Sequence, residues 1–117
     1  MRLIDYPNAI AQQQRSLLRE EQHVRRLQEV VNRLTAEVDA QIAFDPELRN
    51  DAQRKARRIE LMRSPDYQRA LTNLLTAQDR HAEIEIDLNL LRNQFSVLKL
   101  EMREAIATRE LQMVDAA

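Results

Sequence analysis

The stretch EIEIDLNLLRNQFSVLKLEM, residues 83–102, decides the fold of this chain. Its first half alternates apolar and polar residues, which is the pattern of a half-buried β-strand. No glycine or proline interrupts residues 66–117, so nothing marks the ends of such a strand. On a helical wheel the apolar residues separate instead into two stripes on opposite faces. The stretch is therefore predicted to lie in a long helix.

The two stripes need different partners. The first stripe contains Ile84, Leu88, Leu91, Phe95, Leu98, Met102 and Ile106. The second stripe contains Leu75, Ala82, Ile86, Leu90, Val97, Leu100, Ala107 and Leu111. A helix that is apolar on opposite faces must be covered on both. We expect an earlier helix of the same chain to cover the first stripe.

The second stripe is predicted to be the interface of a homo-oligomer, most simply a two-fold dimer, because exposed apolar patches of this size mark interfaces. A different helical protein is another possible occupant. The alternative within one chain is that a short middle helix folds back over this stripe. Its own stripe contains Leu48, Ala52, Ile59 and Met62, and it is too short to cover the whole face.

The composition favours helices over sheets. None of the 117 residues is glycine or cysteine. Without glycine the chain has no easy route to the positive-φ turns of β-hairpins, whereas its abundant Leu, Ala, Arg, Glu and Gln are good helix formers. A chain that is 32% charged and 3% aromatic is typical of long helices and coiled coils. We expect an all-α fold and a single domain over residues 1–117.

Two prolines mark the starts of helices. Asp45 precedes Pro46, and Ser64 precedes Pro65. Each pair has the form of an N-cap followed by proline at the first helical position, where a missing N–H costs nothing. The predicted helices therefore span about residues 8–43, 46–63 and 65–114. We expect the first and third to form a long antiparallel hairpin resembling a coiled coil, unless Ser64–Pro65 is only a kink in one very long helix.

A heptad pattern in the first helix indicates a helical partner. Apolar residues recur seven apart at Ile10, Leu17, Val24, Val31 and Val38, with Leu27 and Leu34 between them. Gln13, Glu20 and Gln41 occupy the remaining core positions, so the seam is polar at both ends.

The strongest candidate metal ligands are Glu20 and His23. Their Glu-x-x-His spacing places both side chains on one helical face, as in di-iron carboxylate bundles. A two-fold axis would double the motif, and His81 and Glu85 of the third helix are candidate neighbours. The simpler interpretation is that both side chains are solvated at the edge of the seam, so no metal or other cofactor is expected.

The middle helix contains the basic run RKARR, residues 54–58. Arg54, Lys55, Arg57 and Arg58 are candidate phosphate contacts, because neutralised phosphates release counterions and drive non-specific binding. Aromatic residues for stacking on bases are missing nearby, and acidic residues offer partners for these cations. A solvated, ion-paired face is therefore favoured over nucleic-acid binding.

Enzymatic chemistry has little support in the sequence. Cysteine ligands for zinc and a glycine-rich phosphate loop are both missing, and the serines have no recognisable triad partners. No apolar run reaches the length of a membrane span. We expect a non-enzymatic, cytoplasmic interaction or scaffold protein.

Three segments, NDAQRKARR, SPDYQRAL and LRNQFSVLKLEMR, lie within about residues 50–103. Together they resemble short all-helical proteins of unknown function in bacterial and phage genomes. The resemblance implies a helical fold and carries no activity or site residues. Its mobile-element association raises the alternative of a nucleic-acid-binding accessory protein that uses the basic middle helix.

Overall fold

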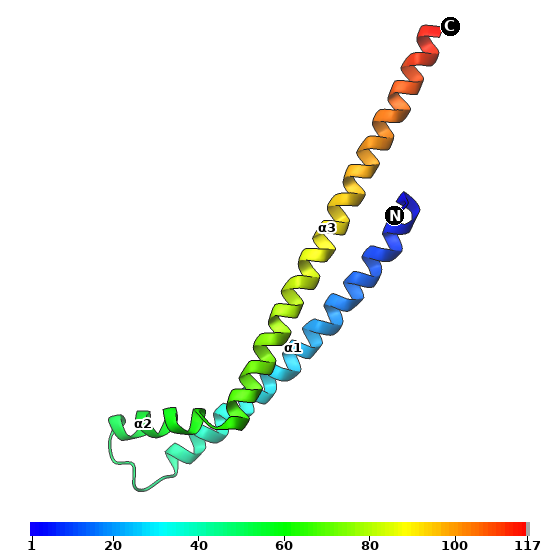
Figure 1. Ribbon diagram of the computed structural model, residues 1–117. Helices are drawn as coiled ribbons and strands as arrows, with labels where there is room; N and C mark the ends of the chain where they lie inside the picture. Colours follow the sequence, from blue (N-terminus) through cyan, green and yellow to red (C-terminus); the bar gives the residue numbers. More distant parts are fainter. Residues whose placement is uncertain (117) are drawn as a thin grey trace. The chain divides into compact units, whose positions relative to one another are not determined.

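The computed structural model describes residues 1–116, and all regular secondary structure in that range is helical. This confirms the predicted all-α fold. A short 3-10 turn at Leu3–Asp5 precedes three α-helices, shown in Figure 1. These are α1 (Tyr6–Ala43), α2 (Asp51–Met62) and α3 (Pro65–Ala116). The chain divides into two compact units, which we call the turn unit (Arg19–His81) and the terminal unit (Met1–Leu18 with residues 82–116).

In the turn unit, α1 and α3 pack against each other in antiparallel directions. Val31 of α1 forms a buried cluster with Ala70 and Leu74 of α3. Farther from the connection, Glu21 of α1 is paired with His81 of α3. Since numbers fall along α1 as they rise along α3, the predicted antiparallel hairpin is confirmed. The surrounding residues of the cluster are Val24, Leu27, Val30 and Leu34, which lie on or beside the predicted heptad seam.

The start of α2 differs from the prediction. The helix begins at Asp51 and not at Pro46. The Asp45 carboxylate accepts a hydrogen bond from the Glu47 N–H at 2.9 Å, so it stabilises a turn instead of capping a helix. The cap is Asn50, whose side-chain oxygen accepts from the Gln53 N–H at 2.9 Å. Leu48 therefore lies outside α2.

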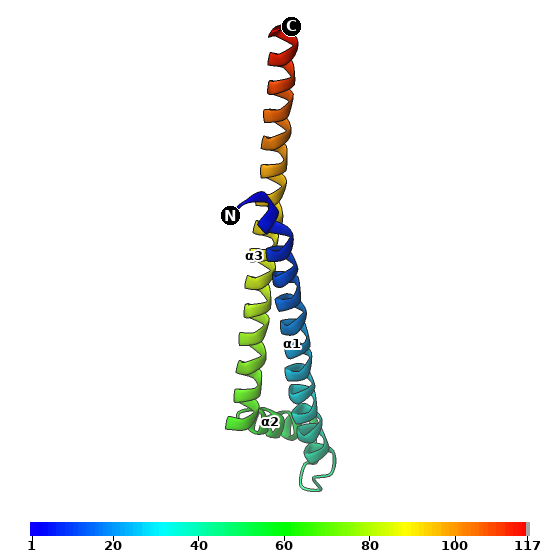
Figure 2. The same ribbon diagram turned by 90° about the vertical axis from the view of Figure 1, so that its right-hand side faces the viewer.

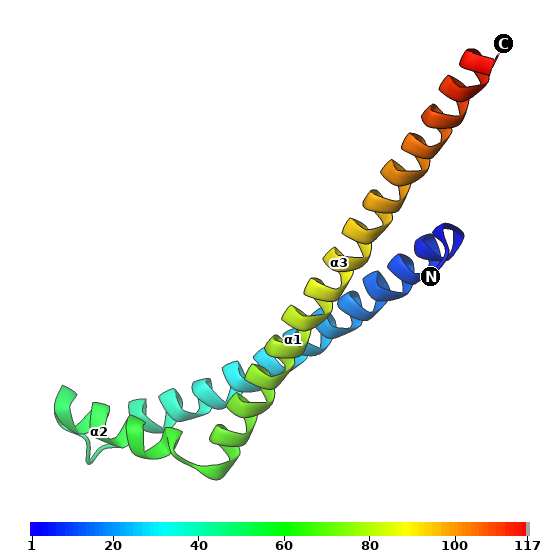
Figure 3. The same ribbon diagram turned by 45° about the horizontal axis from the view of Figure 1, so that its top comes forward.

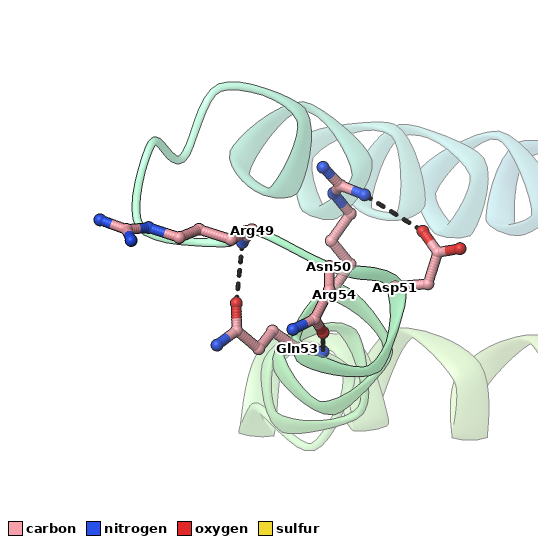
Figure 4. A network of polar contacts seen from close by, with 5 residues as sticks. All are labelled: Arg49, Asn50, Asp51, Gln53 and Arg54. Atoms are coloured by element: carbon pink, nitrogen blue, oxygen red, sulfur yellow. Dashed lines mark hydrogen bonds and ion pairs between the residues drawn. The ribbon is translucent and has the colours of Figure 1, made fainter.

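A reciprocal contact completes the cap of α2. The Gln53 side chain accepts a hydrogen bond from the Arg49 N–H at 2.8 Å (Figure 4). This arrangement resembles a capping box, in which the third residue of the helix reaches back to the residues before it. The Asn50-x-x-Gln53 spacing is visible in the sequence and is the signal that the prediction missed.

The junction at Ser64 and Pro65 is a true break between helices. The Ser64 hydroxyl accepts a hydrogen bond from the Tyr67 N–H at 3.3 Å, which confirms its predicted role as the cap of α3. The Gln68 side chain donates to the Met62 carbonyl at 2.8 Å, at the last residue of α2. The alternative of a kink within one continuous helix is therefore wrong.

In the terminal unit, aromatic packing holds the start of α1 against α3. Tyr6 is 6% exposed and stacks on Phe95, with ring centroids 5.6 Å apart and planes 6° apart. The Lys99 ammonium lies 4.4 Å from the centroid of the Phe95 ring. Beyond this cluster α3 extends past the start of α1 (Figures 2 and 3), and its described residues from 99 onward are all exposed.

Candidate interaction surface

The second stripe lies on the solvent-exposed side of α3. All of its residues are exposed, including the small Ala82 and Ala107. The exposed fractions of the large residues are 52% for Leu75, 66% for Ile86, 53% for Leu90, 52% for Val97, 57% for Leu100 and 65% for Leu111. The alternative in which α2 covers this stripe does not fit these values. Ile59, the central apolar residue proposed for that contact, is itself 54% exposed.

The first stripe is covered where α1 runs alongside it. Leu88 is only 2% exposed, and Ile84, Leu91, Phe95 and Leu98 are half-buried. Leu88 and Leu90 lie two residues apart on one helix and differ from almost complete burial to 53% exposure. The helix thus has one face that the chain covers and an opposite apolar face that it leaves in solvent.

Two residues of the first stripe contradict the prediction that α1 covers all of it. Met102 is 48% exposed and Ile106 is 51% exposed. The reason is length, because α3 has 52 residues and α1 has 38, a difference of 14. An antiparallel partner of that length leaves about four turns of α3 uncovered. The predicted helix ranges already contained this mismatch.

Apolar surface continues from the second stripe toward the N-terminal turn. A groove of about 450 Å³ joins Val97 to the buried ring of Tyr6. Its other lining residues are Met1, Asn93, Gln94 and Leu98. The candidate surface is therefore broader than the predicted residues alone, and it includes the amide side chain of Asn93.

The basic residues of α2 form an ion-paired face. Arg54 pairs with Asp51 at 3.1 Å (Figure 4), and Arg57 pairs with Glu60 at 3.1 Å. Arg58 forms an ion pair with Asp39 of α1. These guanidinium groups are 40–47% exposed and already have carboxylate partners. A phosphate would therefore have to compete with those carboxylates. Lys55 lies on the same helix and is exposed.

The candidate metal ligands do not assemble into a ligand set. One carboxylate oxygen of Glu20 is buried without a hydrogen-bond partner. His23 lines a separate groove of about 250 Å³ beside Arg80. The Nε2 atom of His81 lies 3.3 Å from a carboxylate oxygen of Glu21, not of Glu20. Within residues 1–116 no group of three or more His, Asp or Glu side chains is arranged to hold a metal ion.

No protein-family model, curated protein or solved structure shows a significant match to this chain. Among the described residues, no helix combines the length and the apolar character needed to cross a bilayer.

Proposed function

We propose that the protein is a non-enzymatic scaffold that self-associates through the second stripe of α3. The observation that carries this proposal is the contrast between the two stripes. The chain covers the first stripe along α1 and leaves on the opposite face six large apolar side chains that are 52–66% exposed. Such a surface is costly in water and favourable in an interface, because buried apolar area contributes roughly 25 cal/mol per Å².

A second copy of the chain is the simplest occupant of this surface. In a two-fold dimer each copy presents the same stripe to the other, so one apolar face satisfies both chains. The α1 helix lies on the opposite face of α3 in the terminal unit and leaves the second stripe accessible. The absence of cysteine is compatible with the reducing cytoplasm in which we place this scaffold.

Sedimentation equilibrium of the purified chain tests the proposal. We expect the wild-type protein to be a dimer at micromolar concentration. Replacing Ile86, Leu90 and Val97 by Gln is expected to give a smaller particle that keeps its helical circular dichroism. The matched control replaces Leu18 and Ile59 by Gln, because these residues are 53% and 54% exposed but lie outside the stripe. A compact wild-type monomer would contradict the proposal.

The same preparation tests the two alternatives. Nucleic-acid binding requires an affinity for DNA that falls steeply with salt and is lost when Arg54, Lys55, Arg57 and Arg58 are reversed in charge. A di-iron protein requires stoichiometric iron after growth in iron-supplemented medium, and the iron must be lost in Glu20→Ala. Either result would replace the scaffold proposal.

A further inference from the structure

Six residues of the second stripe, from Ile86 to Leu111, belong to a heptad seam of α3 within the terminal unit. Leu75 and Ala82 of the stripe lie outside this seam. The positions of this seam lie alternately four and three residues apart, from Ile86 to Val114, and most of them hold apolar residues. All nine side chains are exposed. The positions are Ile86, Leu90, Asn93, Val97, Leu100, Glu104, Ala107, Leu111 and Val114. The seam covers about four heptads and roughly 43 Å of helix, which is enough for a stable helix–helix pairing.

Two polar residues interrupt this seam and restrict how a second copy can pair with it. In a parallel pair each residue faces its own counterpart, so Glu104 would face Glu104 at the core of the interface. Two ionised carboxylates in that position repel each other and lose their hydration. In an antiparallel pair the a positions of one helix face the d positions of the other. The a positions of the seam are Leu90, Val97, Glu104 and Leu111, and the d positions are Ile86, Asn93, Leu100, Ala107 and Val114. Glu104 then meets a different residue, whose identity depends on the register.

From the seam and its flanking charges we propose that two copies pair antiparallel along α3, with Asn93 of each copy facing Glu104 of the other. This inference rests on the proposed self-association and specifies its orientation and register. The amide of Asn93 donates a hydrogen bond to the carboxylate of Glu104, and the two-fold axis produces this contact twice. The axis passes between the levels of Val97 and Leu100.

The apolar residues of the seam agree with the same register. With Asn93 opposite Glu104, every other layer between Ile86 and Leu111 joins two apolar side chains. The layers are Ile86 with Leu111, Leu90 with Ala107, and Val97 with Leu100. A shift of one heptad in one direction places Glu104 opposite Ile86, and a shift in the other direction places it opposite Leu100. Each shift buries a carboxylate against an apolar side chain.

Charged residues on the flanks of the seam distinguish the registers independently. In antiparallel pairs, e positions lie near e positions of the other helix and g positions near g positions, and their charges set the orientation. The proposed register contains no like-charge contact in these positions. Its flanking pairs are Asp87 with Thr108, Asn89 with Glu110, Gln94 with Glu101, and Ser96 with Arg103.

The shifted registers contain repulsive flanking contacts. The shift that places Glu104 opposite Ile86 brings Asp87 close to Glu101 of the other copy. The shift that places Glu104 opposite Leu100 brings Glu101 close to Glu101 of the other copy and Arg103 close to Arg103. A parallel pair brings Glu110 close to Asp115 in addition to the facing Glu104 residues. The proposed register is the arrangement among these four without a like-charge flanking pair, and in its layers from Ile86 to Leu111 the only carboxylate, that of Glu104, faces an amide.

Cysteine cross-linking tests orientation and register directly, because the chain has no cysteine of its own. Asn93→Cys and Glu104→Cys are made as separate variants of the full chain, mixed, allowed to exchange subunits and oxidised mildly. We expect disulfides that join the thiol at position 93 of one variant to the thiol at position 104 of the other. Residues 93 and 104 lie about 16.5 Å apart along one helix, so a disulfide between these two positions of a single chain is impossible.

Control mixtures report the neighbouring registers. Asn93→Cys mixed with Val97→Cys detects the shift that places Glu104 opposite Ile86. Val97→Cys mixed with Ala107→Cys detects the shift that places Glu104 opposite Leu100. Predominant cross-linking in either control, or of Asn93→Cys and Glu104→Cys each with itself, would overturn the proposed register. Sedimentation of the unmodified chain separates the two proposals, since a dimer with the wrong cross-links refutes only the orientation, whereas a monomer refutes self-association as well.

An additional variant keeps the orientation testable if thiols perturb the seam. Asn93→Arg places a cation opposite Glu104 in the antiparallel register and opposite a second Arg in a parallel pair. We expect Asn93→Arg to dimerise at least as tightly as the wild type, and the double variant Asn93→Arg/Glu104→Arg to be monomeric. Weaker dimerisation of Asn93→Arg, at a retained helical content, would contradict the proposed contact.

Discussion

Truncating Leu88 or Leu90 to alanine is expected to produce two different defects from the same chemical change. Leu88 is 2% exposed in the covered stripe, and Leu90 is 53% exposed in the second stripe. Both substitutions remove the same atoms from the middle of one helix, so differences in helix propensity cancel between them. The pair therefore separates folding of the chain from association between chains.

The magnitudes follow from the burial of each side chain. Leu88→Ala is expected to cost about 2–5 kcal/mol of unfolding free energy, because it leaves a cavity in a packed contact. That is a large part of the roughly 5–15 kcal/mol available to a typical domain. Leu90→Ala is expected to cost less than about 0.5 kcal/mol in the monomer, as surface substitutions usually do.

The effect of Leu90→Ala on association is larger because the dimer contains the side chain twice. Full burial of a leucine is worth about 1.5–3 kcal/mol, and about half of Leu90 remains to be buried. Two copies then contribute about 1.5–3 kcal/mol to the dimer. At about 1.4 kcal/mol per factor of ten, the dissociation constant should rise about 10- to 100-fold.

Urea unfolding at the lowest measurable concentration and sedimentation equilibrium provide the two readouts. Leu88→Ala should lower the unfolding midpoint at that concentration, and Leu90→Ala should instead raise the dissociation constant. An unchanged dissociation constant in Leu90→Ala would refute the placement of this residue in the interface. Equal losses of stability in both variants, with no change in association, would show that both faces of α3 are covered within one chain.

Substitutions at three further sites test individual contacts. Tyr6→Ala is expected to cost about 3–5 kcal/mol in thermal unfolding, because it removes a buried ring stacked on Phe95, whereas Tyr6→Phe keeps the stack and should cost much less. Asn50→Ala should cost about 0.5–2 kcal/mol and increase hydrogen exchange at the first amides of α2, and unchanged exchange would refute its role as the cap. Breaking the partly exposed pair of Arg58 and Asp39 by Arg58→Gln should cost at most about 1 kcal/mol in urea unfolding, and a larger loss would show a structural role for this contact.

The faces of the helices were predictable from the sequence because helical periodicity fixes which residues share a side. The heptad of α1 and the two stripes of α3 follow from spacing alone, and the burial of Val31 and Leu88 agrees with it. The role of Ser64 as the N-cap of α3 was also predictable from the sequence, because Pro65 follows it directly. These features are local or periodic, and neither requires knowledge of the three-dimensional contacts.

The start of α2 was not decided by local sequence. Asp45 and Asn50 are both good N-cap residues, and Pro46 adds weight to the wrong one. The structure uses Asp45 to close the turn after α1 and leaves the helix to begin after Asn50. Contacts between helices were equally hidden. The pairing of His81 with Glu21 depends on the register of the hairpin, which residue spacing within each helix does not determine.

The strand-like alternation in EIEIDLNLL is a consequence of two apolar stripes on one helix. Ile84 and Leu88 belong to the first stripe, which α1 covers, whereas Ile86 and Leu90 belong to the exposed second stripe. The offset of two residues between the stripes produces the period of two. In a strand the intervening polar residues would share one face. On α3, Glu85 and Asp87 fall instead on opposite flanks, between the two apolar faces. A flank between two seams is where charge controls which helices pair and in which register. The alternation that resembles a strand therefore records one covered and one exposed apolar face on the same helix, and in the proposed dimer Asp87 is the charged residue of this stretch that opposes a shifted register.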